Sequence, residues 1–304
     1  MSKSIAVLGI LVMDVSGVSP ELPRAGETIL GKGFGMSPGG KGTNQAVAAK
    51  RLGADVSLIT KYGRDDMGKL LCNFLEGEGL LSPSVIEDAS LPSGAALIMV
   101  SEAGKNQILV CPGACTAISP ADMAAVRPII ENADILLCQL ECNLDATVTA
   151  MQWAKANGKY VVLNTAPYQP LSGEILALCD MITPNEVEAA QLVGFDAVTP
   201  DNAEAACDAL RARGVKTVII TLGEHGAFVK NDELCQLVPP YRVKAVDSTG
   251  AGDCFNGALV AALAEGAELL PAIQFANAAA AISVTSRGSA ASMPTKAQVE
   301  AFLK

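Results

Sequence analysis

The sequence predicts an α/β fold in which a mainly parallel central sheet is covered by helices on both faces, with a small extra β-sheet. Short runs of β-branched and other apolar residues alternate along the chain with longer stretches of helical periodicity, a pattern typical of βαβ units. Two regions break this alternation and carry strand-like runs of their own. Half of the 304 residues are apolar, which is enough to bury a large core. We expect one domain over residues 1–304.

The strands of the main sheet are predicted from five short apolar runs. These are residues 5–8, 56–60, 135–140, 160–163 and 217–221. Helical patterns cover residues 46–52, 66–78, 120–132, 144–157, 201–213 and 254–264. Right-handed crossovers place the carboxyl ends of parallel strands along one edge, and ligands of such sheets collect at that edge. Polar residues that directly follow a strand are therefore the first candidates for a site.

The small β-sheet is predicted from residues 12–38 and 94–112. In the second region, the strand-like runs 96–101 and 107–111 flank a turn-forming stretch, residues 102–106, which indicates a hairpin. In the first region, residues 15–37 combine Gly and Pro with short apolar pieces. We expect the strands of both regions to leave the main sheet.

Two glycine-rich segments run into helical patterns. Residues 246–253 read Val-Asp-Ser-Thr-Gly-Ala-Gly-Asp and precede the helix 254–264. Small residues let the N–H groups of a helix start approach an anion, which the helix dipole also favours. Asp253 at this place is either a first-turn capping acid or a base that accepts a proton from a hydroxyl attacking a phosphoryl group. The second segment, residues 38–46, precedes the helix 46–52, so we expect two polar ligands.

Five ordered segments resemble the ribokinase-like, or PfkB, family of sugar kinases. The signatures are residues 39–44, Gly-Gly-Lys-Gly-Thr-Asn, and 247–253, Asp-Ser-Thr-Gly-Ala-Gly-Asp, and between them lie the segments 139–141, 183–188 and 221–226. Residues 42–49 and 275–281 are most similar to the ribokinase branch. The resemblance implies a ribokinase-like fold and an ATP-dependent kinase that phosphorylates a hydroxyl of a small sugar such as ribose or deoxyribose. It also implies Mg²⁺, activation by K⁺, and a homodimer formed through the small sheet, which would act as a lid.

The resemblance also assigns the site residues. Asp253 would be the general base, and the amides of Gly250, Ala251 and Gly252 would stabilise developing charge. The sugar would contact Asp14, Gly40, Lys41, Gly42, Thr43, Asn44, Glu141 and Asp253. The nucleotide would contact Asn185, Thr221, Leu222, Gly223, Glu224, His225, Gly226, Gly252 and Asn277. Asn185 and Glu188 would hold Mg²⁺. Potassium would lie among Asp247, Thr249, Ser283, Ser286, Gly288 and Ser292.

One position departs from the ribokinase pattern. Two residues before Asp14, ribokinases have an asparagine that touches the sugar, and this chain has Val12. Because valine cannot hydrogen-bond a hydroxyl, the site should discriminate less in favour of that hydroxyl, which makes a deoxysugar plausible. A nucleoside or ketose kinase of the same family is an alternative. A catalytically silent sugar-binding regulator is another.

Composition argues against several other classes of protein. The formal charge of −10 argues against a nucleic-acid surface. The longest Ala-rich apolar stretch, residues 276–284, is too short to span a membrane. Nine scattered cysteines with a single histidine make a zinc site improbable and fit reduced thiols of a cytoplasmic protein.

Two common nucleotide-binding motifs are incomplete. Residues 35–42 nearly form a P-loop, but Gly42 stands where a magnesium-binding Ser or Thr is required. After the first strand, Gly9 is not followed by the further glycines of a dinucleotide-binding turn. The sequence therefore predicts neither a P-loop enzyme nor a nicotinamide oxidoreductase.

Overall fold

The central sheet of the computed structural model, which describes residues 3–304, has nine strands. Their spatial order is β13 (Cys235–Val238), β12 (Ala227–Lys230), β11 (Thr217–Thr221), β10 (Met181–Ile182), β9 (Tyr160–Leu163), β8 (Ile135–Cys138), β1 (Ser4–Leu8), β4 (Asp55–Gly63) and β5 (Val85–Asp88). Neighbouring strands are parallel from β5 to β11, and only the β11–β12–β13 edge is antiparallel. The predicted α/β class and mainly parallel sheet are confirmed.

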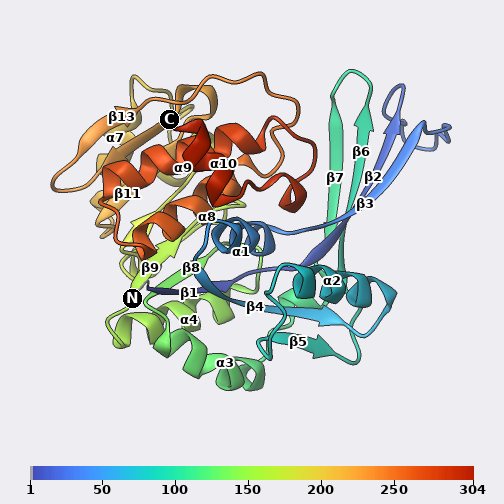
Figure 1. Ribbon diagram of the computed structural model, residues 1–304, viewed down its shortest axis with the longest axis horizontal. Coiled ribbons are helices and arrows are strands. Elements are labelled where there is room, and N and C mark those ends of the chain that lie inside the picture. Colours follow the sequence, from blue (N-terminus) through green and yellow to red (C-terminus); the bar gives the residue numbers. More distant parts are fainter. Residues whose placement is uncertain (1–2) are drawn as a thin grey trace.

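Helices cover this sheet on both faces (Figure 1). In chain order they are α1 (Lys41–Arg51), α2 (Asp66–Gly77), α3 (Pro120–Asn132), α4 (Leu144–Ala156), α5 (Gly173–Leu176), α6 (Glu186–Val193), α7 (Ala203–Arg211), α8 (Ala251–Ala264), α9 (Leu269–Ser283) and α10 (Lys296–Phe302). In Figure 1, α1, α8 and α9 lie on one face of the sheet and α3 and α4 on the other. Three of the predicted elements, residues 120–132, 160–163 and 217–221, have the same bounds in the structure.

A separate four-stranded sheet projects from the body (Figure 1). Its order is β3 (Gly33–Gly39), β2 (Val12–Ser19), β6 (Gly94–Ser101) and β7 (Asn106–Cys111). Strand β2 runs parallel to β6, and the other two pairs are antiparallel. The two regions that broke the alternation in the sequence therefore build this sheet together, as predicted.

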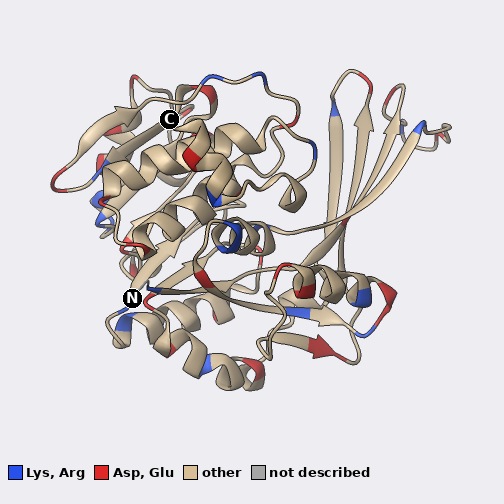
Figure 2. Cartoon of the chain, in the orientation of Figure 1, with Lys and Arg blue, Asp and Glu red and all other residues tan. Residues whose placement is uncertain are grey.

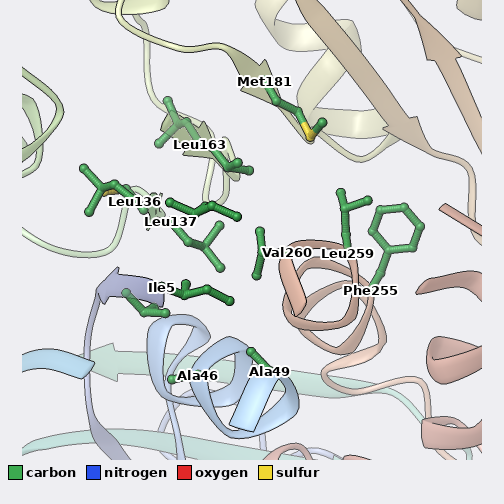
Figure 3. Packing of buried hydrophobic residues seen from close by; sticks show 14 of the residues in the cluster. Ile5, Ala46, Ala49, Leu136, Leu137, Leu163, Met181, Phe255, Leu259 and Val260 are labelled. Atoms are coloured by element: carbon green, nitrogen blue, oxygen red, sulfur yellow. The ribbon is translucent and has the colours of Figure 1, made fainter. Parts of the chain in front are cut away.

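The core lies where α1 and α8 pack on the sheet (Figure 3). Phe255, Leu259 and Val260 of α8 are buried with residues of β1, β8 and β9. The two helices approach closely because α8 presents a glycine: a Cβ atom on Gly257 would lie 2.5 Å from the carbonyl oxygen of Gln45. This close contact brings the beginning of α1 beside the beginning of α8.

Two helices begin earlier than the sequence predicts. Helix α1 begins at Lys41 rather than at residue 46, and α8 begins at Ala251 rather than at residue 254. Glycine has a low helix propensity, but tertiary contacts stabilise the start of α1. The Thr43 hydroxyl donates to the Ile10 carbonyl (2.9 Å), and the Lys41 amide donates to Glu141 (2.8 Å). The segment 41–44 is therefore a helical turn and not a loop.

Charged residues are dispersed over the molecule. In the view of Figure 2, acidic and basic residues are scattered over the body, and the strands of the small sheet carry few of either. Within residues 3–304, none of the helices combines the length and the hydropathy needed to cross a bilayer.

Candidate active site

A polar cleft of about 160 Å³ lies where the carboxyl ends of the parallel strands meet the start of α8. It is lined by Lys41, Asn164, Ala166, Thr183, Asn185, Glu188, Thr221, Ser248, Gly250, Ala251, Gly252, Asp253 and Asn256. Two larger cavities, of about 340 and 510 Å³, are lined mainly by apolar side chains. Only the polar cleft brings carboxylates, a lysine and a helix start together, at the edge of the sheet where ligands are expected.

Asp253 lies in the first turn of α8 and is 6% exposed. Its Oδ2 accepts a hydrogen bond from Asn44 Nδ2 (2.9 Å), and its Oδ1 accepts one from Gln45 Nε2 (3.0 Å). These two hydrogen bonds fix the orientation of the carboxylate. Both donors come from α1, so the close packing of α1 on α8 positions this group.

The start of α8 is shaped to receive an anion. Gly250, the residue before the helix, has φ of 77°, a left-handed conformation that glycine adopts without strain. The amide of Ala251 donates to the Ser248 carbonyl (3.2 Å), so this N–H group is used within the turn that precedes the helix. The amides of Gly252 and Asp253 belong to the first helical turn, whose N–H groups have no acceptor within the helix. A negatively charged group is favoured at this position.

The charge of Lys41 in this cleft is influenced by three carboxyl groups. The charge of Asp253 is the main cause of the raised pKa of Lys41, and Glu141 and Glu188 add to it. Burial raises the pKa of Glu141 to about 7, although Lys41 opposes this shift. Burial also raises the pKa of Asp14 to about 6, and the charge of Asp253 adds to the effect. Acidic groups thus outnumber Lys41 in and around the cleft, although Asp14 and Glu141 are not among the residues that line it.

Asn185 and Glu188 form a reciprocal cap at the start of α6. Asn185 Oδ1 accepts from the Glu188 amide (2.8 Å), and Glu188 Oε2 accepts from the Asn185 amide (2.9 Å). Both residues line the cleft. Burial is the main cause of the raised pKa of Glu188, which means that its charge is poorly compensated by the protein around it. The two residues that cap α6 are therefore also the two that were expected to bind a ligand.

The other expected nucleotide residues lie in two places. Thr221 ends β11 and lines the cleft, and residues 222–226 form the tight turn to β12. Asn277 does not line the cleft: its amide donates to the carbonyls of Val238 (3.3 Å) and Pro239 (3.0 Å). Asn277 therefore fixes the segment after β13.

The segments expected to hold potassium are joined by Asp247. Its Oδ1 accepts from the amide and hydroxyl of Thr249 (3.0 and 2.7 Å), and its Oδ2 accepts from the Gly288 amide (3.0 Å). Ser283 and Ser292 are buried, and their hydroxyls donate to nearby carbonyls. The loop before α8 and the segment after α9 are thus held side by side.

Comparison with known proteins decides the family. Residues 2–296 match the family described as pfkB family carbohydrate kinase.

The chain belongs to the pfkB family of carbohydrate kinases.

The chain is 40% identical to a ribokinase of Haemophilus influenzae, with 100% of this chain and 99% of the relative covered. It is 34% identical to a deoxyribokinase of Salmonella typhimurium, with 98% of each covered. Its fold matches a Thermotoga maritima ribokinase with a TM-score of 0.89 and 35% identity, covering 99% of both chains. It matches an Arabidopsis thaliana ribokinase complexed with ribose and ATP with a TM-score of 0.90 and 30% identity, covering 100% of this chain and 99% of that one. The protein is an ATP-dependent sugar kinase.

The structure adds residues of the kinase cleft that sequence reasoning did not single out. Gln45, Asn164, Thr183 and Asn256 are all buried and polar, and the last three line the cleft. Gln45 lies in the segments 38–46 and 42–49 that the sequence analysis singled out, and this was the signal for it. Thr43, by contrast, is fully buried and does not line the cleft.

Proposed function

We propose that this kinase transfers the γ-phosphoryl group of ATP to a hydroxyl of a pentose, with Asp253 as the general base. The observation that carries the proposal is the placement of a buried carboxylate, held by two amide donors, in the first turn of a helix that favours anions. The sugar hydroxyl would give its proton to Asp253 as its oxygen attacks the γ-phosphorus, and ADP would leave. Lys41 and the first-turn amides of α8 would stabilise the charge on the transferred group.

Asn185 and Glu188 are the residues that would hold Mg²⁺. The oxygens of Glu188 accept hydrogen bonds only from Asn185 among the contacts of the described residues, so lone pairs remain for the water shell that this ion keeps. The raised pKa of Glu188, which burial causes, fits a carboxylate that a cation would complement. Bound there, Mg²⁺ would neutralise phosphate charge.

Potassium is proposed to act through the paired segments 246–249 and 283–292. The support is structural: the Asp247 carboxylate already joins them through Thr249 and Gly288, and a cation bound by their oxygens would order the loop before α8. Rates are expected to be higher in potassium than in tetramethylammonium. Equal rates in the two salts would contradict this proposal.

For the sugar, we expect 2-deoxyribose to be phosphorylated at least as well as ribose. Val12 and Asp14 are two residues apart on β2, so their side chains share one face of the small sheet. Val12 is buried, and a Cβ atom on the facing Gly94 would lie 2.7 Å from its Cγ1. An apolar group therefore stands two residues from a carboxylate acceptor. Both ribokinases and deoxyribokinases are among the relatives of this chain.

The first test is ATP consumption across a panel of ribose, 2-deoxyribose, other pentoses, ketohexoses and nucleosides. The Asp253→Asn variant keeps the shape of the side chain and removes the base, and we expect a loss on the order of 10²-fold or more in kcat. A near-normal rate in this variant would overturn the assignment of the base. A rate with nucleosides or ketohexoses alone would overturn the pentose assignment.

Val12→Asn tests the choice of sugar. The added amide would hydrogen-bond a hydroxyl that valine leaves without a partner, so kcat/KM for ribose relative to 2-deoxyribose should rise by roughly 10-fold or more. Val12→Leu, which adds volume without a polar group, is the matched control. An unchanged ratio in Val12→Asn would show that this position does not select the sugar.

The small sheet is proposed to cover the sugar and to join two copies of the chain. On the face opposite Asp14, Phe34 is 75% exposed, and Leu97 and Leu109 are 46% and 59% exposed. A second small sheet of the same composition would cover this apolar surface. Sedimentation should give a dimer, and Phe34→Glu should shift it towards monomer. A monomer at every concentration would contradict the proposal.

A further inference from the structure

A chain of buried side-chain amides leads from Asp253 to the ends of the parallel strands. Gln45, which has no exposed surface, donates from Nε2 to Asp253 Oδ1 (3.0 Å) and to Asn164 Oδ1 (3.0 Å). Its Oε1 accepts from Gln139 Nε2 (2.6 Å). Both N–H bonds and the carbonyl oxygen of Gln45 are therefore engaged.

The orientation of this amide is set by its neighbours. The Thr183 backbone carbonyl can only accept, and it receives Asn164 Nδ2 (2.8 Å). The oxygen of Asn164 must therefore face Gln45, which in turn must present its nitrogen. Gln139 fixes the other end, because its Nε2 donates to the Gln45 oxygen.

The same hydrogen bonds return to the backbone of α8. The Thr183 hydroxyl donates to Asn256 Oδ1 (2.5 Å), and Asn256 Nδ2 donates to the Gly252 carbonyl (2.8 Å). Gly252 immediately precedes Asp253, so the ring closes. The side chain of Asp253 and the first turn of α8 are held by one set of contacts to the ends of β9 and β10.

We propose that Gln45 is a positioning residue that orients the Asp253 carboxylate for proton transfer. This inference rests on the proposed role of Asp253 as base. Gln45 does not line the cleft, so it acts through Asp253 and not on the substrate. Around Asp253 stand three other acidic side chains, Asp14, Glu141 and Glu188, and Lys41. A donor bound to Oδ1 holds the carboxylate in one orientation among these competing charges.

The test compares Gln45→Met alone and together with Asp253→Asn. Met keeps the length of the side chain and removes both donors. We expect kcat to fall on the order of 10-fold or more, with the KM values for sugar and ATP changed less than about three-fold, because ground-state binding does not use Gln45. In the Asp253→Asn background, the same change should cost less than about two-fold in kcat, because the group that Gln45 positions is gone.

Two further variants separate positioning from stability. Gln139→Met removes the contact that fixes the Gln45 oxygen and leaves the hydrogen bond from Gln45 to Asp253 in place. It should therefore show a smaller kcat loss than Gln45→Met, and this loss should also vanish in the Asp253→Asn background. Gln298→Met removes a cap of α10, where Gln298 Oε1 accepts from the Thr295 amide (2.7 Å). It is the matched control, expected to lower the melting temperature and leave kcat unchanged. Phosphoryl transfer followed with radiolabelled ATP over hours resolves the low rates of the double variants.

The outcomes distinguish this inference from the proposed function. If Asp253→Asn is nearly fully active, the base assignment fails, and Gln45 has nothing to position. If Asp253→Asn loses activity but Gln45→Met keeps the wild-type kcat, only the positioning role is refuted. An equal kcat loss from Gln45→Met in both backgrounds, or a loss confined to KM, would also refute it.

Discussion

Gly257→Ala should disrupt the contact on which the cleft depends. The added Cβ would lie 2.5 Å from the Gln45 carbonyl oxygen, 2.6 Å from Ala48 Cβ and 3.0 Å from the Ala49 amide nitrogen. None of these atoms is the end of a flexible side chain. Ordinary contact begins at 3.4 Å, so α1 and α8 must separate by roughly 1 Å at their crossing.

This clash should lower the stability of the protein. Overpacking lowers the free energy of unfolding by about 1–3 kcal/mol, and the upper part of that range applies because the clash is with backbone. The higher helix propensity of Ala offsets up to about 1 kcal/mol of this loss. A net loss of about 2 kcal/mol corresponds to a fall in Tm of roughly 3 °C, since unfolding entropy is about 2.1 cal/mol/K per residue. A displacement of about 1 Å of the Asp253 partners should also lower kcat by up to about 10²-fold.

Thermal unfolding and steady-state kinetics of the purified variant measure both effects. Gly77→Ala in α2 is the matched control, because a Cβ there meets nothing within 4 Å, and it should raise stability by about 0.5–1 kcal/mol. A Gly257→Ala protein as stable as the wild type, with normal kcat, would refute the argument that this glycine sets the approach of the two helices.

Two further predictions concern the charges of the cleft. Lys41→Met removes the cation whose pKa the Asp253 charge raises, and it should lower kcat on the order of 10²-fold; unchanged steady-state kinetics would contradict a role in phosphoryl transfer. Burial raises the pKa of Glu141 from 4.5 to about 7, so the folded protein keeps a proton that the unfolded chain loses, and the free energy of unfolding falls as pH rises from about 4.5 to 7. Glu141→Gln should reduce this fall in urea titrations at pH 5 and 7.5, whereas an unchanged pH dependence would show that Glu141 does not titrate in this range.

Predictions from the sequence succeeded where a local pattern was enough. The strand at residues 160–163 and the helix at residues 120–132 have their predicted bounds. A short apolar run and a capped periodic helix are each defined by residues within the segment. Turn chemistry and strand-like runs predicted strands in the regions 12–38 and 94–112, and the family resemblance implied that they form one small sheet. The predicted starts of α1 and α8 were wrong by five and three residues, because glycine-rich turns become helical only through contacts made elsewhere in the fold.

In the candidate site too, local features could be predicted from the sequence, and contacts between distant residues could not. The signatures at residues 39–44 and 247–253 predicted a site, because glycines before a helix and an acid in its first turn are local features of the chain. Lys41 and residues 250–253 of these signatures line the polar cleft. The contact of Asn277 with the nucleotide stays a prediction, and the structure shows in addition that its amide donates to the carbonyls of Val238 and Pro239. Nothing in the sequence around Asn277 reports a partner about forty residues away.

The sequence by itself determined the fold class and the family, and it predicted two glycine-rich helix starts as ligand sites, because these follow from periodicity and from residues adjacent in the chain. The tertiary structure alone decided that Gln45, Asn164 and Asn256 form one hydrogen-bonded ring with Asp253. Gln45 lies 119 positions before Asn164, and the amides of these residues carry no pattern of their own. They meet because α1 and α8 pack closely at Gly257, and burial then requires each amide to find a partner.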